Sequence, residues 1–218
     1  MANIDQCSEM LSQAYAGAVF DAMRELGEVD CVLPHEITAV LPDRKIVGPA
    51  FTVMGHKEKG LDEHETLLRW TEFLSKAPPD HVVVCQPHDH TIAHMGELSA
   101  ETLQLRGIKG YVVDGGSRDT GFIKSIGFPV FCRYLTCRDV VGSWVPDAFD
   151  QPVEIGQVKI EPGDFIFGDI DGVLRIPRHL VSQVADRVIE VMNTENLVRK
   201  AILSGTDPQE AYLKYGLF

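Results

Sequence analysis

The feature that most constrains the fold is a short apolar run that lies between glycines and leads directly into a charged turn. Residues Lys109 to Val113 are mostly apolar, with two valines and a tyrosine. Such a run predicts a strand buried on both faces, as in a sheet covered by helices. The turn after it, residues 114–119, contains Asp114, Arg118 and Asp119. Ligands of α/β proteins bind outside the carboxyl ends of strands, so this turn is the first candidate for a functional site.

A helix is predicted directly before this strand. It should begin at Gly96-Glu97 and end at Arg106-Gly107, with Gly107 as its C-terminal cap and with Leu98, Thr102 and Leu105 on one face. The free N–H groups at its first turn favour an anion, and Gly96 lets a ligand approach the backbone closely.

The side chains around the turn suit a carboxylic acid and a hard cation. Arg118 offers a planar fork that can hold a carboxylate with two hydrogen bonds. Asp119 and Glu97 supply the oxygen ligands that Mg²⁺ or Mn²⁺ prefers. An alternative is a solvated Arg118-Asp119 pair, with Glu97 favoured only by the helix dipole. Judged one residue at a time, the solvated pair is favoured.

Four motifs in order along the chain change that judgement. They are Gly96-Glu97-Leu98-Ser99-Ala100, the run from Arg106-Gly107 to Arg118-Asp119, Gly127-Phe128-Pro129-Val130-Phe131, and Pro162-Gly163-Asp164 with Gly168-Asp169-Ile170-Asp171-Gly172-Val173. Together they resemble the RraA-like family. This family contains class II 4-hydroxy-4-methyl-2-oxoglutarate aldolases, oxaloacetate decarboxylases and a protein inhibitor of a bacterial ribonuclease.

The resemblance implies a role for each residue of the site. Asp119 would bind the metal directly, Glu97 would bind it through water, and Arg118 would hold the substrate carboxylate and help to stabilise an enolate. The amides of residues 96–99 would bind the same carboxylate. In the family, a glutamate from the C-terminal helix of an adjacent subunit completes the metal's outer shell, and an alignment by eye places it at Glu195.

The resemblance also implies a reaction and an alternative function. The reaction is retro-aldol cleavage of a 4-hydroxy-2-oxo diacid, or decarboxylation of oxaloacetate, with pyruvate as product. Both proceed through the pyruvate enolate, whose charge a divalent ion can neutralise. The protein would be a homo-oligomer, a trimer or hexamer. The alternative function is that of a non-catalytic regulator that binds a ribonuclease. Such a regulator would not need the metal-binding residues Glu97 and Asp119, which are present in this chain. A methyltransferase is disfavoured because no glycine-rich cofactor loop follows the first predicted strand.

The order of the remaining segments, together with the resemblance to the RraA-like family, implies an α/β fold. The expected fold is a layered β/β/α domain of the swivelling type with a strand core and outer helices, as a single domain over residues 1–218. Helices are expected at Ser8–Leu26, Asp62–Lys76, Pro177–Leu203 and Asp207–Tyr215. Strands are expected at Lys45–Met54, His81–Cys85, Pro129–Arg133, Val153–Ile160, Asp164–Gly168 and Val173–Ile176. Gly48-Pro49 inside the first of these suggests an edge strand or a bulge.

Three histidines follow the strand His81–Cys85. His88, His90 and His94 have spacings that suit zinc, but no cysteine or further histidine lies nearby at a recognised zinc spacing. We therefore favour loop histidines, one or two of which line the pocket. The base that accepts the 4-hydroxyl proton stays open between one of these histidines and a water held at the metal.

Composition excludes several classes of partner. The chain has 20 Lys and Arg against 32 Asp and Glu, a net charge of −12 without a basic cluster, which disfavours nucleic acid and anionic membranes. Its five cysteines form no C-x-x-C pair, which favours a reducing cytoplasm. No apolar stretch is long enough for a bilayer, so we expect a soluble protein.

Overall fold

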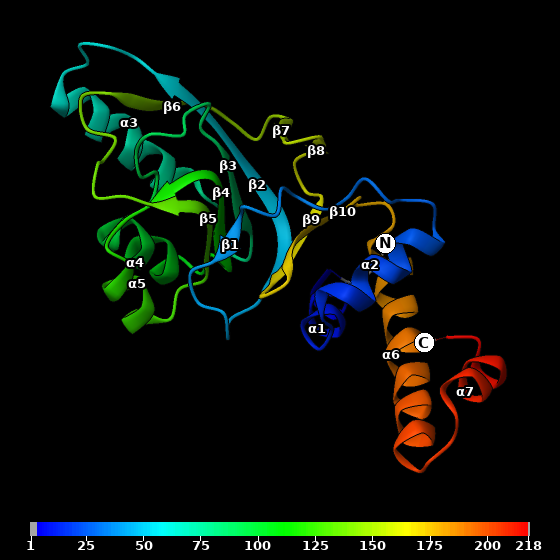
Figure 1. The fold of residues 1–218 in the computed structure, drawn as a ribbon. Coiled ribbons are helices and arrows are strands. Elements are labelled where there is room, and N and C mark those ends of the chain that lie inside the picture. Colours follow the sequence, from blue (N-terminus) through cyan, green and yellow to red (C-terminus); the bar gives the residue numbers. More distant parts are fainter. Residues whose placement is uncertain (1–3, 218) are drawn as a thin grey trace.

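The computed structural model describes residues 4–217 and shows an α/β fold, as the sequence predicts (Figure 1). Its main sheet has the strand order β1-β5-β4-β3-β2-β9-β10, and β6 also pairs with β2. The strands of this sheet are β1 (Thr38–Ala39), β2 (Ile46–Lys57), β3 (Val82–Gln86), β4 (Gly110–Ser117), β5 (Val130–Leu135), β6 (Trp144–Phe149), β9 (Phe165–Asp169) and β10 (Gly172–Ile176). A separate hairpin consists of β7 (Val153–Ile155) and β8 (Val158–Ile160).

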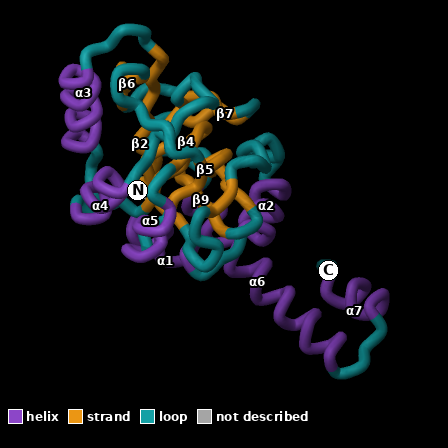
Figure 2. The backbone as a smooth tube through the Cα atoms, turned by 60° about the vertical axis from the view of Figure 1, so that its left-hand side comes forward, coloured by secondary structure: helices purple, strands orange, loops and turns teal. Residues whose placement is uncertain are grey.

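Helices cover the sheet in two groups. The helices are α1 (Ile4–Ser12), α2 (Ala16–Glu25), α3 (Glu63–Lys76), α4 (Glu97–Leu105), α5 (Thr120–Ile126), α6 (Val181–Leu203) and α7 (Pro208–Tyr215). Helices α3, α4 and α5 pack on one face of the parallel strands, whereas α1, α2 and α6 pack against β9 and β10. Figure 1 shows α3, α4 and α5 on the left of the molecule and α1, α2 and α6 on the right, and Figure 2 shows the end of α6 and α7 projecting away from the sheet.

Alternating side chains of β3 show why the domain is layered. Val83 and Cys85 point into the core beneath α3 and α4, and Val82 and Val84 point into the core shared with the β7–β8 hairpin. A strand that is apolar at every position can be buried on both faces in this way. The result is a helix layer, a sheet layer and a small second β layer.

Parallel pairing brings the loops that follow β3, β4 and β5 to one edge of the sheet. Strand β2 is parallel to β3, β3 to β4, and β4 to β5. Helix α4 connects β3 to β4, and α5 connects β4 to β5. The segment before α4 and the loop after β4 therefore meet, as the sequence predicts.

The single N-terminal helix predicted at Ser8–Leu26 is wrong, because the structure has two helices there. Tyr15 between them is extended, with φ −132° and ψ 158°. The N–H of Ala16 donates a 2.8 Å hydrogen bond to the carboxylate of Asp169 on β9. This tertiary hydrogen bond starts a new helix where helical periodicity alone predicts continuation.

The prediction of an edge strand or a bulge at Gly48-Pro49 holds only locally, because β2 pairs there with β9 alone but lies inside the sheet as a whole. This strand of 12 residues is central, with β9 on it over residues 46–49 and β3 over residues 50–54. The irregularity lies further on, between Met54 and Gly55, where the pairing with β6 shifts register. A Cβ at Gly55 would overlap the indole of Trp144, so the close packing at this bulge requires a residue without a side chain.

Other boundaries and one helix face also differ from the prediction. The strand expected at Val153–Ile160 is a hairpin that turns at Gly156, which has φ +65°. Helix α6 begins at Val181, after a turn that follows Pro177. The face of α4 that carries Leu98 and Leu105 is exposed, and Ala100 and Leu103 form its buried side instead. Strands β1 and β6 and helix α5 were not predicted from the sequence. Within residues 4–217, no helix is both long enough and apolar enough to cross a bilayer.

Candidate active site

Arg118 and Asp119 form the two-residue link between β4 and α5. Asp119 has left-handed backbone angles, φ 55° and ψ 34°, which aspartate tolerates better than most residues. Its carboxylate turns toward α4, where Oδ2 accepts a 3.1 Å hydrogen bond from the N–H of Glu97. The Nε of Arg118 lies 3.4 Å from the same oxygen. Asp119 therefore caps the first turn of α4 and holds the guanidinium beside it.

Gly96 is the residue that permits this close arrangement. Its backbone is extended, so its conformation does not require glycine. A Cβ at this position would lie 2.9 Å from Oδ2 of Asp119 and 3.1 Å from Nε of Arg118. The predicted close approach to the backbone at Gly96 is therefore made by side chains of the protein itself, which leaves no room for a methyl group.

Asp139 is a member of this cluster that sequence reasoning missed. Its Oδ2 accepts a 2.9 Å hydrogen bond from an Nη of Arg118, and its Oδ1 accepts from the N–H of Val141. It lies in the loop between β5 and β6, 21 residues from Arg118, and no motif or spacing marks it. Asp139 and Asp119 therefore fix the guanidinium from two sides.

We expect Asp139→Ala to lower kcat/KM about tenfold, because a misplaced guanidinium binds the substrate less well. The melting temperature should change little, since both partners are partly exposed and such ion pairs add little stability. Asp139→Asn, which keeps an acceptor for Arg118, should retain more activity than the alanine variant. Equal kinetics for the wild type and Asp139→Ala would show that Arg118 needs no such support.

These residues form one end of a cleft of about 640 Å³. The charged side chains that line it are Glu97, Arg118, Asp119 and Asp139, so three carboxylates face one guanidinium. With all four ionised, two negative charges are uncompensated. The rest of the lining is mostly apolar and comes from α3, α4 and the loop before β6.

Glu195 does not reach this cleft within one chain. It lies on α6 beside a separate hollow of about 470 Å³ that Tyr15, Val198 and Arg199 also line. Figure 1 shows α6 at the end of the molecule away from α4 and α5. A site that contains both Arg118 and Glu195 therefore requires two chains.

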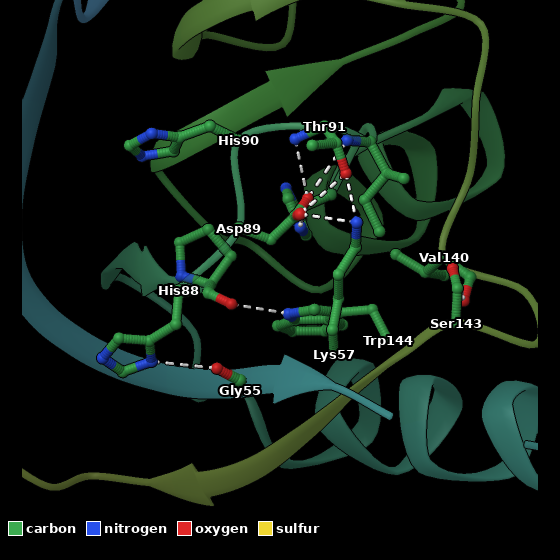
Figure 3. A network of polar contacts seen from close by, with 12 residues as sticks. Gly55, Lys57, His88, Asp89, His90, Thr91, Val140, Ser143 and Trp144 are labelled. Carbon is green, nitrogen blue, oxygen red and sulfur yellow. Dashed lines mark hydrogen bonds and ion pairs between the residues drawn. The ribbon is translucent and has the colours of Figure 1, made fainter. Parts of the chain in front are cut away.

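The three candidate histidines lie in different surroundings, and Figure 3 shows the separate positions of His88 and His90. Nδ1 of His88 lies 3.0 Å from the carbonyl oxygen of Gly55, and the exposed ring of His90 lies 3.6 Å from Asp114. His94 is buried edge-on against Trp144. Among residues 4–217, no three His, Cys, Asp or Glu side chains are grouped so as to hold a metal ion, which argues against the zinc alternative.

His94 is the candidate histidine that lies along the cleft, but its ring is fully buried. Its Nε2 is 3.6 Å from Asp89, and neither ring nitrogen has a hydrogen-bond partner among the described residues. Burial lowers the pKa of His94 to about 4, so the ring is neutral at pH 7. Burial alone would raise the pKa of Asp89, but hydrogen bonds from Lys57 and Thr91 hold it at about 2 (Figure 3). His94 is therefore a weak base whose ring is closed off from solvent.

Comparison with known proteins identifies the family. Residues 16–175 match the RraA-like family, described as Aldolase/RraA. The chain belongs to the RraA-like family. A Halalkalibacterium halodurans relative, named "Putative 4-hydroxy-4-methyl-2-oxoglutarate aldolase", is 30% identical over 78% of this chain and 78% of its own.

Two further relatives differ in size and description. Protein DlpA of Legionella pneumophila is 34% identical over 78% of this chain, and the match spans 28% of its length. The crystal structure of Streptomyces coelicolor RraAS2 is described as an unusual member of the RNase ES inhibitor RraA protein family. It has a TM-score of 0.78 and 25% identity, and the match covers 89% of this chain and 96% of RraAS2. Aldolase and RraA names therefore both occur among its relatives.

The family match includes the whole segment from Gly96 to Asp119 and also Asp139, but it ends before Glu195. The role of Glu195 therefore depends on the alignment by eye alone.

The residues present in the cleft fit a divalent cation. Its two uncompensated negative charges equal the charge of one such ion. Mg²⁺ commonly takes one or two protein carboxylates and completes its shell with waters, so three grouped ligands are not required. The Oδ2 of Asp119 is engaged by α4 and Arg118, and Oδ1 has no partner among the described residues. Asp119 can therefore cap the helix and bind a cation at the same time.

Proposed function

We propose that this protein is a divalent-metal-dependent lyase that breaks a carbon–carbon bond of a 2-oxo acid and releases pyruvate. The reaction is retro-aldol cleavage of a 4-hydroxy-2-oxo acid, with oxaloacetate decarboxylation as a second activity of the same site. The observation that carries this proposal is the cluster in which Arg118 and Asp119 lie against the first turn of α4 at Gly96. It places a carboxylate-binding fork, free backbone amides and a hard oxygen ligand at one end of one cleft.

The chain itself would bind and orient the substrate. Arg118 would hold the C1 carboxylate, and the amides of Gly96, Leu98 and Ser99 at the start of α4 would complete its binding. Held in this way, the keto group lies beside Asp119. Asp139 would keep the guanidinium in place while the substrate enters.

Mg²⁺ or Mn²⁺ would be held directly by Asp119, through water by Glu97, and from a neighbouring subunit by Glu195. When bound, this ion would neutralise the negative charge that develops on the keto oxygen as the bond breaks. Arg118, beside it, would add a second positive charge at the same point.

The proton acceptor for the 4-hydroxyl group is best assigned to a water near Glu97. Each histidine candidate has a structural objection. The ring of His94 is fully buried with a low pKa, that of His88 contacts the Gly55 carbonyl, and that of His90 lies beside Asp114. We therefore propose that no histidine takes this proton directly.

A ribonuclease regulator is the second candidate, and the similarity to RraAS2 favours it. A protein that acts only by binding would not need the Arg118–Asp119–Asp139 cluster to be intact. One assay distinguishes the two candidate functions. Purified protein with Mg²⁺ should release pyruvate, measured with lactate dehydrogenase, from 4-hydroxy-2-oxo acids or oxaloacetate. Asp119→Asn should abolish the signal, and no pyruvate from any substrate would leave the regulator as the better function.

We further propose that residues 1–218 act as one domain in a homotrimer or hexamer whose sites lie between subunits. In such a ring, α6 of one chain would place Glu195 beside the Arg118 loop of the next. Exposed apolar side chains near the end of α6 and on α7, such as Leu203 and Leu213, provide surface for the contact.

Mixing two inactive variants tests the shared site. Asp119→Ala and Glu195→Ala subunits, exchanged at equal amounts, should regain up to about a quarter of wild-type activity, because that fraction of interfaces receives both carboxylates. Mass measurement of mixed oligomers is the control for exchange. Exchange without any recovery would show that Glu195 serves its own chain or no site.

A further inference from the structure

Beyond the cluster of Arg118, Asp119 and Asp139, the cleft is lined by apolar side chains that form an apolar wall. The apolar residues that form it are Leu67, Trp70 and Leu74 of α3, Met95 and Leu98 at the start of α4, and Val140 and Val141 before β6. Leu67 and Leu98 are 47% and 74% exposed, so they lie at the mouth, whereas Trp70, Leu74 and Val140 are buried at its base. An apolar ligand would cover surface that now contacts water.

This wall is held in place by the protein's own contacts. The indole N–H of Trp70 donates a 2.8 Å hydrogen bond to Oγ of Ser99, so its one polar group is already satisfied. The ring also packs edge-on against Phe73 and Trp144, with centroids 5.2 and 6.0 Å away. The wall is therefore preformed and offers a ligand mostly hydrocarbon surface. The hydroxyls of Thr71 and Thr102, which also line the cleft, already donate to backbone carbonyl oxygens of their own helices.

Charge in the cleft is unfavourable for a second carboxylate. Arg118 is the one cationic side chain among the described residues that line it, and it is already paired with Asp139. The nearby basic groups of α3 are engaged elsewhere: Arg69 with Glu65 at 2.7 Å, and Lys76 with Glu72 at 2.6 Å. Within one chain, a ligand with one carboxylate at Arg118 and another along the wall would leave the second unpaired beside apolar side chains.

We infer that the substrate is a 4-hydroxy-2-oxo acid with a single carboxylate and an alkyl or aryl group on C4, which lies along this wall. The inference rests on the proposed function, and it departs from the diacid that the family resemblance implies. Cleavage of such a substrate breaks the C3–C4 bond. The 4-hydroxyl group loses its proton, C4 leaves as an aldehyde, and C3 gains a proton to give pyruvate.

Binding of unreactive 2-oxo acids tests the wall without any turnover. In the presence of Mg²⁺, 2-oxooctanoate should bind at least tenfold more tightly than 2-oxoglutarate. Each added methylene from 2-oxopentanoate to 2-oxooctanoate should strengthen binding about threefold to fourfold. Tryptophan fluorescence reports binding directly, because the chain has two tryptophans and Trp70 lies in the wall.

A charge change in the wall should weaken the preference for the apolar ligand. Leu67→Lys places an ammonium at the mouth on a half-exposed helical position, where lysine is well tolerated. This substitution should lower, by tenfold or more, the ratio of the affinity for 2-oxooctanoate to the affinity for 2-oxoglutarate. Leu67→Met, which keeps an apolar side chain of similar size, is the matched control and should preserve the ratio.

Turnover of paired substrates separates this inference from the proposed function. Pyruvate release from 4-hydroxy-2-oxo-4-phenylbutanoate should exceed release from 4-hydroxy-4-methyl-2-oxoglutarate at least tenfold in kcat/KM. Preferential cleavage of the diacid would overturn the inference and leave the lyase intact. Tight binding of 2-oxooctanoate without cleavage of any substrate would support the wall and overturn the lyase. If 2-oxooctanoate binds no better than 2-oxoglutarate, the inference fails, and the exposed part of the wall is better explained as a contact with another subunit.

Discussion

Treatment with EDTA is expected to abolish pyruvate release, and excess Mg²⁺ or Mn²⁺ is expected to restore it. The cleft carries two uncompensated negative charges, which repel an anionic substrate until a cation is bound. Residues 115–119 contain no lysine that could form a Schiff base, and no lysine lines the cleft within the described part of the chain. Loss of turnover should therefore be complete within the sensitivity of the assay.

The control is the thermal melt of the metal-stripped protein. It should keep a cooperative transition, because the apolar cores of the layered domain contain none of the proposed metal ligands, Asp119, Glu97 and Glu195. Full activity after stripping would contradict the prediction. So would a substrate adduct that borohydride traps on the protein, because such an adduct indicates a Schiff base.

Arg118→Lys is expected to lower kcat/KM on the order of a hundredfold or more, although it keeps the positive charge. An ammonium group cannot hold a carboxylate with the two parallel hydrogen bonds of a guanidinium. It also cannot contact Asp119 and Asp139 from two sides while it binds the substrate. Steady-state kinetics with the preferred substrate give the measurement.

Arg106→Lys is the matched control for this substitution. Arg106 follows the other end of α4, and its guanidinium donates to the carbonyl oxygens of Ser75 and Ala77. Its replacement should leave turnover near the wild-type value. Near-normal kinetics for a folded Arg118→Lys protein would remove Arg118 from the proposed site.

The best sequence predictions concern elements with strong local signals. Asp62 accepts from the N–H groups of His64 and Glu65 as the N-cap of α3, and Gly107 with φ +79° follows α4. The β-branched runs at β3 and β4 also lie in strands, as expected, although β4 continues through residues 114–117, which were expected to belong to the turn. Caps and strand patterns act within a few residues, so sequence alone can reveal them.

The site was predictable only in part. The sequence places Arg118 and Asp119 after a buried strand and Gly96 at the start of a helix. Parallel topology then brings these segments to one edge of the sheet. The structure adds that Asp119 caps α4, that Gly96 is required by contact rather than by its backbone angles, and that Asp139 supports Arg118.

The sequence by itself therefore determined the layered α/β architecture and the segment that carries the candidate chemistry, since both follow from local periodicity, caps and motifs. Tertiary structure alone decided where Asp139 and Asp169 act. Each makes its decisive hydrogen bond to a residue far along the chain, Asp139 to Arg118 and Asp169 to Ala16, 153 residues away. Such bonds form only after distant segments have packed, so local propensity carries no signal for them.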